Sequence, residues 1–170
     1  MPTLHPELAF VETLIGTWTG RGHGEYPTIE PFDYVESITF DHVGKPFLAY
    51  TQRTRAHDPS GRPGAPMHAE MGYWRFPAPG RVELVVSHPT GVGEVSAGTV
   101  VTDVDGVLTV EIETTQVACT PTAKAVTRIA RSFTVRGDVL HYVVRMAAVG
   151  LPLQHHLEAR LTRVDSAPAP

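Results

Sequence analysis

The chain has 170 residues, of which 42% are hydrophobic and 19% are charged, and it contains 15 glycines and 15 prolines. This length suits one domain with a full core, and the glycine and proline content favours many turns over long helices. The formal net charge of −4 shows no basic excess, which argues against a nucleic-acid partner.

The N-terminal stretch MPTLHPELAFVETL has neither a basic region nor a long apolar run, so we expect no signal peptide. No segment has the length needed to span a bilayer, so we expect no membrane partner. The single cysteine, Cys119, cannot form an internal disulfide. Together these features predict a cytoplasmic protein.

A short helix is predicted over Pro6–Leu14 (PELAFVETL). Proline stands near its start, Glu7 falls in the first turn, and Leu8, Val11 and Leu14 recur at helical spacing. A helix of this length is too short to be stable alone, so we expect it to plug or flank a larger structure.

Ten strands are predicted after the helix, separated by turn sequences such as PAPG, HPTG and VDG. Apolar and polar residues alternate clearly in several of them, for example from Leu108 to Glu113. The expected strands are Trp18–Gly24, Tyr34–Val43, Phe47–Ala56, Met67–Phe76, Arg81–His88, Gly93–Val104, Val107–Val117, Ala125–Arg136, Val139–Ala148 and Gln154–Val164.

This pattern predicts an all-β fold, a ten-stranded antiparallel up-and-down β-barrel of the lipocalin or fatty-acid-binding type with a short N-terminal helix. A sandwich is the competing architecture, and the short connections favour the barrel. We expect one domain over residues 1–164, followed by a disordered tail over residues 165–170. A barrel with more than eight strands leaves internal room for a ligand.

Glycines are concentrated in GTWTGRGHGEYPTI, with Gly20, Gly22 and Gly24 in a G-x-G-x-G pattern. A dinucleotide fingerprint needs a following helix, and a phosphate loop needs a Walker lysine. The stretch Tyr26-Pro27-Thr28 supplies neither. We therefore expect the glycines to let the first strand bend sharply or to let backbones approach closely.

The nine histidines show no H-x-H, HExxH or Cys/His spacing typical of a zinc site. Most, including His23, His88 and His141, have contexts typical of surface or satisfied core residues. His155 and His156 differ because they adjoin an apolar face of the last strand. A single imidazole with apolar neighbours suits the proximal side of a haem, and a packed or solvated histidine is the alternative. No G-x-S-x-G motif supports serine catalysis.

Several segments resemble the nitrobindin family. They are G-x-W-x-G-x-G at residues 16–22, YPTI, P-F-x-Y at residues 31–34, HVGKPFLAYTQRT, PMHAEMGYWR and VVRMAAVGLPLQHHLEARL. The resemblance covers nearly the whole chain in the same order.

The resemblance implies a ten-stranded barrel that holds ferric haem b at one end, binds nitric oxide and isomerises peroxynitrite to nitrate. The chain has no C-x-x-C-H motif, so such a haem would be held non-covalently. By resemblance, the iron ligand and catalytic residue is His156, in Q-x-H-L. The other implied haem-contacting or pocket residues are Thr28, Lys124, Met67, His68 and Met146.

Strand parity alone disagrees with this ligand, because it puts His155 rather than His156 on the face of Leu157, Ala159 and Leu161. A β-bulge would shift that parity. The resemblance covers both flanks and assigns His156. For His68, a distal hydrogen-bond donor and a plain wall residue both remain open.

Two other functions fit the same sequence. One is a non-enzymatic carrier of a fatty acid or another apolar molecule, and the other is a haem-based nitric oxide sensor. The expected partners are small molecules, peroxynitrite and nitric oxide, and a homodimer is left open.

Overall fold

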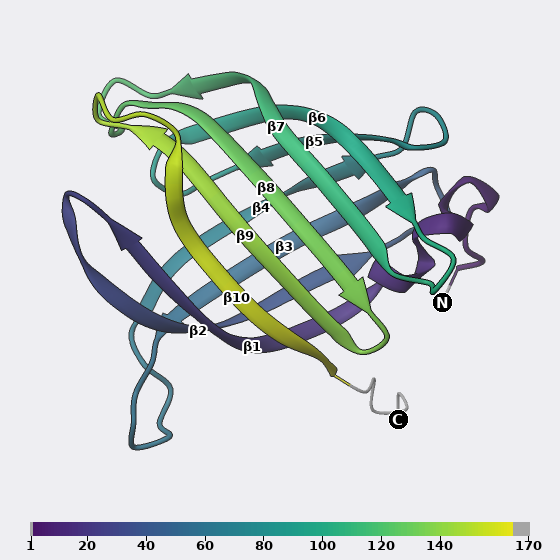
Figure 1. The fold of residues 1–170 in the computed structure, drawn as a ribbon, viewed down its shortest axis with the longest axis horizontal. Coiled ribbons are helices and arrows are strands. Elements are labelled where there is room, and N and C mark those ends of the chain that lie inside the picture. Colours follow the sequence, from purple (N-terminus) through teal and green to yellow (C-terminus); the bar gives the residue numbers. More distant parts are fainter. Residues whose placement is uncertain (1, 165–170) are drawn as a thin grey trace.

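The computed structural model describes residues 2–164, which form a closed ten-stranded barrel (Figure 1). Each strand pairs antiparallel with its neighbours in the chain, and β1 pairs with β10 to close the barrel. The predicted fold is confirmed. The strands are β1 (Gly16–Tyr26), β2 (Ile29–Asp41), β3 (Phe47–Ala56), β4 (Pro66–Arg75), β5 (Arg81–Ser87), β6 (Val92–Thr102), β7 (Leu108–Cys119), β8 (Val126–Arg136), β9 (Val139–Ala148) and β10 (Gln154–Val164).

The expected strand ends lie within two residues of the observed ones, except at the start of β2. That strand begins at Ile29, five residues before the expected Tyr34. Its first five residues are exposed or half-buried, so they lack the alternation that predicts a strand. The tail expected over residues 165–170 lies outside the described residues.

The N-terminal helix η1 (Pro6–Leu14) is a 3₁₀ helix. Its buried residues Leu8, Val11 and Leu14 recur every three residues. Three residues make one turn of a 3₁₀ helix, so these side chains share one face and pack together on the barrel core. Within residues 2–164, no helix is long and apolar enough to cross a membrane.

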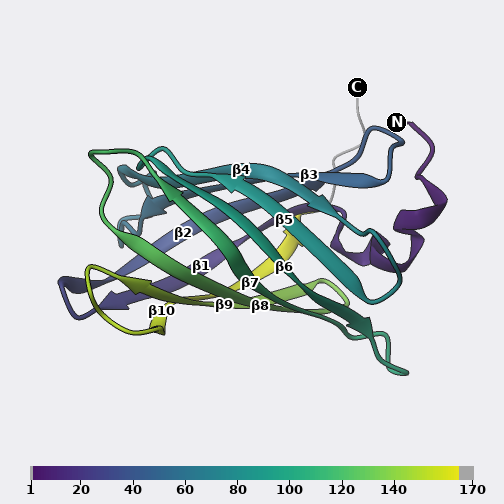
Figure 2. The same cartoon turned by 90° about the horizontal axis from the view of Figure 1, so that it is seen from above.

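Helix η1 closes one end of the barrel, where it leads directly into β1 (Figure 2). The Trp18 indole Nε1 donates a hydrogen bond to the Leu14 carbonyl at 2.9 Å. The Arg163 guanidinium stacks over the Trp18 ring at 4.0 Å and donates to the Thr13 carbonyl at 2.8 Å. These contacts attach the helix to β1 and β10.

The hairpin loops alternate between the two ends of the barrel, as up-and-down topology requires. Because η1 lies at the start of β1, the β1–β2, β3–β4, β5–β6, β7–β8 and β9–β10 loops gather at the opposite end. Aromatic side chains fill the interior between the ends; among them Trp74 packs on Phe40 and Phe133 with ring centroids 5.3 and 5.2 Å away. These aromatic side chains leave room for a ligand at the end of the barrel opposite η1.

Candidate functional site

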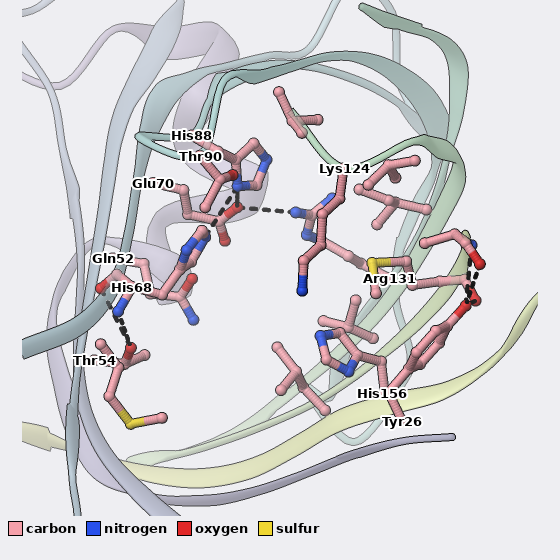
Figure 3. A pocket seen from close by; sticks show the side chains of 18 of the residues that line it. Tyr26, Gln52, Thr54, His68, Glu70, His88, Thr90, Lys124, Arg131 and His156 are labelled. Atoms are coloured by element: carbon pink, nitrogen blue, oxygen red, sulfur yellow. Dashed lines mark hydrogen bonds and ion pairs between the residues drawn. The ribbon is translucent and has the colours of Figure 1, made fainter. Parts of the chain in front are cut away.

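A cavity of about 600 Å³ occupies the end of the barrel opposite η1 (Figure 3). This volume lies within the range of about 300–1,000 Å³ that is usual for small-molecule sites. Its wall is largely apolar, with Phe32, Val126, Ile129 and Val144 among the lining residues. All of the site residues expected from the sequence line this cavity: Thr28, Met67, His68, Lys124, Met146 and His156.

These residues come from five parts of the chain. Thr28 lies in the β1–β2 turn and Lys124 in the β7–β8 loop, and both are exposed at the mouth. Met67, on β4, is 44% exposed. The remaining three, which lie deeper and are half-buried, are His68 on β4, Met146 on β9 and His156 on β10.

A β-bulge decides which of the two adjacent histidines faces the cavity. On β10, His155 pairs with Arg145 of β9, and Leu157 pairs with the next residue, Val144, so one residue of β10 is extra. The bulge shifts the alternation, and both His156 and Leu157 line the cavity. Strand parity without the bulge, which pointed to His155, was wrong for this reason.

The His156 ring is held by a backbone carbonyl. Its Nδ1 lies 3.1 Å from the Glu25 oxygen, and because a carbonyl only accepts, Nδ1 carries the hydrogen. Burial lowers the pKa of His156, although the hydrogen bond to Glu25 opposes the shift. The neutral ring therefore presents an Nε2 lone pair, which is the state that a metal-ligating histidine needs.

Tyr26 supports the same segment. Its ring packs edge-on to His156 with centroids 5.4 Å apart. Its hydroxyl accepts a hydrogen bond from the Ala148 amide at 2.9 Å and lies 3.3 Å from the Met146 and Ala148 carbonyls. Tyr26 thus connects the end of β1 to the end of β9 beside the histidine.

A buried group of charged and polar side chains lies across the cavity from His156 (Figure 3). The Arg131 guanidinium donates to Glu94 at 2.5 and 2.8 Å and to Glu70 at 2.9 Å. His88 bonds to Glu94 through Nε2 at 2.5 Å and to His68 through Nδ1 at 3.0 Å. Strands β4, β6 and β8 and the β5–β6 loop bring these residues together.

The electrostatics of this group follow from burial and pairing. Burial alone would raise the pKa of Glu94, but the Arg131 charge and the hydrogen bonds from Arg131 and His88 lower it to about 2. Burial alone would lower the pKa of Arg131, but Glu70 and Glu94 raise it above its ordinary value. Burial, assisted by His88, Arg131 and His156, lowers the pKa of His68. His68 is therefore a neutral ring in the cavity wall.

A second buried network lies next to this group. Gln52 and Tyr142 donate to the Glu36 Oε2 at 2.6 and 3.0 Å, and Tyr142 is hydrogen-bonded to Tyr34 at 2.8 Å. Burial raises the pKa of Glu36 to about 7, although the hydrogen bonds from Gln52 and Tyr142 oppose the rise. Of the three buried glutamates in residues 2–164, Glu70 and Glu94 pair with Arg131, and Glu36 has no cation beside it.

Sequence reasoning missed the buried group and Tyr26. His88 was expected on the surface or as a satisfied core residue; the structure shows the second, with its side chain buried between Glu70 and Glu94, but these partners were not foreseen. A signal was present, because Glu94 and Arg131 occupy inward positions in the alternation of their strands. A charge at such a position needs a buried partner.

The sequence profile described as "THAP4-like, heme-binding beta-barrel domain" matches residues 7–163. The chain belongs to this family. The nitrobindin resemblance is confirmed by the match.

Curated relatives of the family cover nearly the whole chain. Peroxynitrite isomerase 2 of Mycobacterium marinum is 57% identical over 160 residues, which are 94% of this chain and 96% of that protein. Peroxynitrite isomerase of Nocardia farcinica is 54% identical over 94% of this chain and 92% of that protein. The crystal structure of Rv2717c from M. tuberculosis aligns with a TM-score of 0.90 and 48% identity, over 95% of this chain and 99% of that one.

The cavity fits the haem that the family name implies. His156 supplies a neutral, oriented nitrogen donor, and the surrounding wall is largely apolar. At the mouth, Lys124 and Thr28 supply a cation and a hydroxyl where a haem's propionates would reach solvent. A site with this donor set suits a non-covalent haem.

Proposed function

We propose that this chain binds haem b non-covalently through His156 and isomerises peroxynitrite to nitrate. The observation that carries the proposal is the hydrogen bond from His156 Nδ1 to the Glu25 carbonyl, which leaves Nε2 free as a ligand. The names of the relatives that share more than half of its sequence support the reaction. We take residues 1–164 as the haem-binding unit and a cytoplasmic location as its setting.

Each expected residue has a role in this proposal. His156 would hold the haem iron and is the proposed catalytic residue. Lys124 offers a point charge to a propionate and Thr28 a hydroxyl. Met67, His68 and Met146 line the wall, and we assign His68 to the wall because its ring is neutral and already bonded to His88.

When bound, a ferric haem would supply a Lewis-acidic iron that acts on peroxynitrite. Peroxynitrite and nitrate contain the same atoms and carry the same charge, so the conversion needs no net proton or electron. The chain's task is therefore to orient the ligand and to exclude water. The largely apolar part of the wall serves the second purpose, because it offers little polar surface that would hold water beside the ligand.

Nitric oxide is the second small molecule that we propose for the same site, and removal of both reactive nitrogen species is the wider role. The fatty-acid carrier is less well supported. The buried cation of the cavity, Arg131, already pairs with Glu70 and Glu94, so its charge is balanced without a fatty carboxylate.

Two measurements test the proposal. Haem titration of the purified protein should give a Soret band that His156→Ala removes and His155→Ala retains. Stopped-flow mixing with peroxynitrite should then show faster decay and a higher nitrate yield than the same concentration of free haem. A Soret band that both variants retain would contradict the assignment of His156 as the iron ligand. Peroxynitrite decay no faster than with free haem would contradict the proposed enzymatic activity, and the protein would then be a sensor or a carrier.

A further inference from the structure

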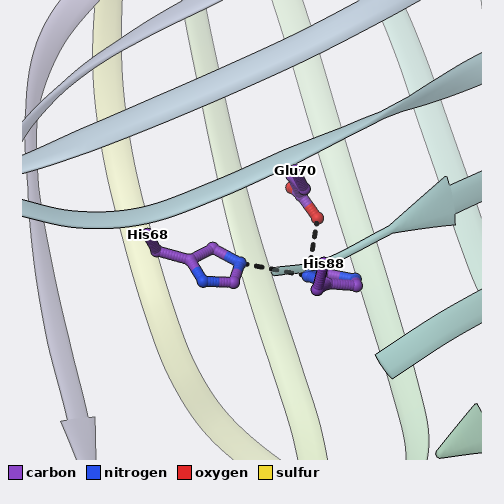
Figure 4. Close-up of side chains that lie close together, drawn as sticks. All are labelled: His68, Glu70 and His88. Atoms are coloured by element: carbon purple, nitrogen blue, oxygen red, sulfur yellow. Dashed lines mark hydrogen bonds and ion pairs between the residues drawn. The ribbon is translucent and has the colours of Figure 1, made fainter. Parts of the chain in front are cut away.

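Three side chains in the cavity wall converge on one point (Figure 4). His68 Nε2 lies 3.0 Å from His88 Nδ1, and His88 Nδ1 lies 3.5 Å from Glu70 Oε2. The three ligand atoms all lie within 4.8 Å of one another. We propose that His68, Glu70 and His88 form a second metal site, for a divalent transition ion of the zinc class.

The spacing suits such an ion. Zinc binds histidine nitrogen and carboxylate oxygen at about 2.0–2.2 Å, which in a tetrahedron places neighbouring ligand atoms roughly 3.3 Å apart. The two distances from His88 Nδ1 lie close to this value on either side. Two histidines and one carboxylate also leave one coordination position open, and here it faces the cavity.

Outer contacts already orient two of the three ligands. The Glu94 carboxylate accepts from His88 Nε2 at 2.5 Å, which places the His88 proton on Nε2 and leaves Nδ1 with its lone pair. Tyr50 donates to Glu70 Oε1 at 2.9 Å. A carboxylate behind a ligating histidine is a recurring feature of zinc sites. His68 has only to take the tautomer that is protonated on Nδ1.

The charge of the buried group also favours a cation. Glu70 and Glu94 carry two negative charges, and Arg131 supplies one positive charge between them. An ion at His68 and His88 offsets the remaining negative charge. To bind, the ion must replace the hydrogen bond between His68 and His88 and must compete with Arg131 for Glu70 Oε2. If it does not bind, these residues form a purely structural hydrogen-bonded group.

No local pattern predicts this site, since the histidines follow none of the usual zinc spacings. His68 and Glu70 lie two residues apart on β4, and His88 follows β5. Because β4 and β5 are antiparallel neighbours, the barrel register brings residues 18 to 20 positions apart together.

Calorimetric titration of the full-length, chelator-treated protein with ZnCl₂ tests the proposal. We expect one ion per chain, lost in His68→Gln and in His88→Gln. The matched control is His141→Gln, because His141 also bonds a glutamate, Glu158, at 2.7 Å but on the exposed surface. Equal binding by all four proteins, or no binding by the unmodified chain, overturns the proposal.

A second measurement separates this site from the haem site and from misfolding. Haem-free protein with Co²⁺ should show visible d–d bands that His156→Ala retains and His68→Gln loses. Bands lost in His156→Ala would place the ion at the proximal histidine and overturn the proposal. Should His88→Gln fail to fold by circular dichroism, His68→Gln carries the test, because the His68 ring is half-buried and has a single hydrogen bond among residues 2–164.

Discussion

Gly22 on β1 lies directly across from Tyr34 on β2, and the Tyr34 ring occupies the space that a side chain at Gly22 would need. Tyr34 in turn holds the Tyr142 hydroxyl at 2.8 Å, inside the network around Glu36. The last glycine of the G-x-W-x-G-x-G motif therefore makes room for a ring that borders the cavity.

Gly22→Ala should destabilise the protein. A Cβ would overlap the Tyr34 ring, and overpacking of this kind costs about 1–3 kcal/mol. The control is Gly93→Ala on β6, where the nearest atom to a Cβ is the Ala118 oxygen at 4.0 Å. Urea unfolding should show a lower midpoint for Gly22→Ala and no loss for Gly93→Ala. Equal midpoints would mean that the Tyr34 ring can move aside freely.

Tyr26→Phe should weaken haem retention without changing the iron ligand. The hydroxyl is the hydrogen-bond partner of the buried Ala148 amide, and an unsatisfied buried amide costs about 1–3 kcal/mol. The β9 end beside His156 should then open more often, so haem should transfer faster to excess apomyoglobin while the Soret maximum stays in place. Tyr73→Phe, at an exposed tyrosine on β4, is the control. A displaced Soret maximum would instead implicate the iron ligand itself.

Glu36 should make stability fall as pH rises. Its pKa is about 7 in the folded protein against an ordinary value of 4.5, so the native state holds a proton that the unfolded chain has released between these values. The stabilisation is complete below about pH 4.5 and is lost as pH rises through about 7. Its upper limit is roughly 3 kcal/mol.

Comparison of the protein with Glu36→Gln at pH 5 and pH 8 measures this effect. The amide cannot ionise, so the variant should gain free energy of unfolding relative to the unmodified protein at pH 8. Glu83→Gln, at an exposed carboxyl on β5, should show no such trend. A Glu36→Gln difference that is the same at both pH values would show that the buried carboxyl does not titrate in this range.

The alternation of apolar and polar residues and the turn sequences predicted the barrel. Each strand buries one face, so its sequence alternates with a period of two residues. The spacing of Leu8, Val11 and Leu14 also predicted a short helix over Pro6–Leu14, although not its 3₁₀ form. The early start of β2 was not visible, because at the barrel mouth neither face is buried and no alternation is required.

The site was predictable only where a motif marked it. Thr28, Lys124 and His156 were assigned by resemblance to the family, and the bulge that turns His156 toward the cavity leaves no local signal. The contacts of Glu94 with His88 and Arg131 join residues 6 and 37 positions apart, and only the strand register fixes them. The available signal was that Glu94 and Arg131 occupy inward positions of their strands, and this signal does not identify the residues with which they pair.

Two arginine–glutamate pairs with equal separations should differ greatly in their effect on stability. Arg131 lies 2.5 Å from Glu94 in the interior, and Arg128 lies 2.5 Å from Glu113 on the surface. Arg131→Met would leave Glu70 and Glu94 buried without their cation, a loss that typically costs about 3–5 kcal/mol. Arg128→Met should leave the free energy of unfolding nearly unchanged, because water screens that pair. In urea unfolding, Arg131→Met combined with Glu94→Gln should recover part of the loss, since one uncompensated charge is removed. Equal losses in the two single variants would mean that distance, rather than burial, determines how much each ion pair contributes to the free energy of unfolding.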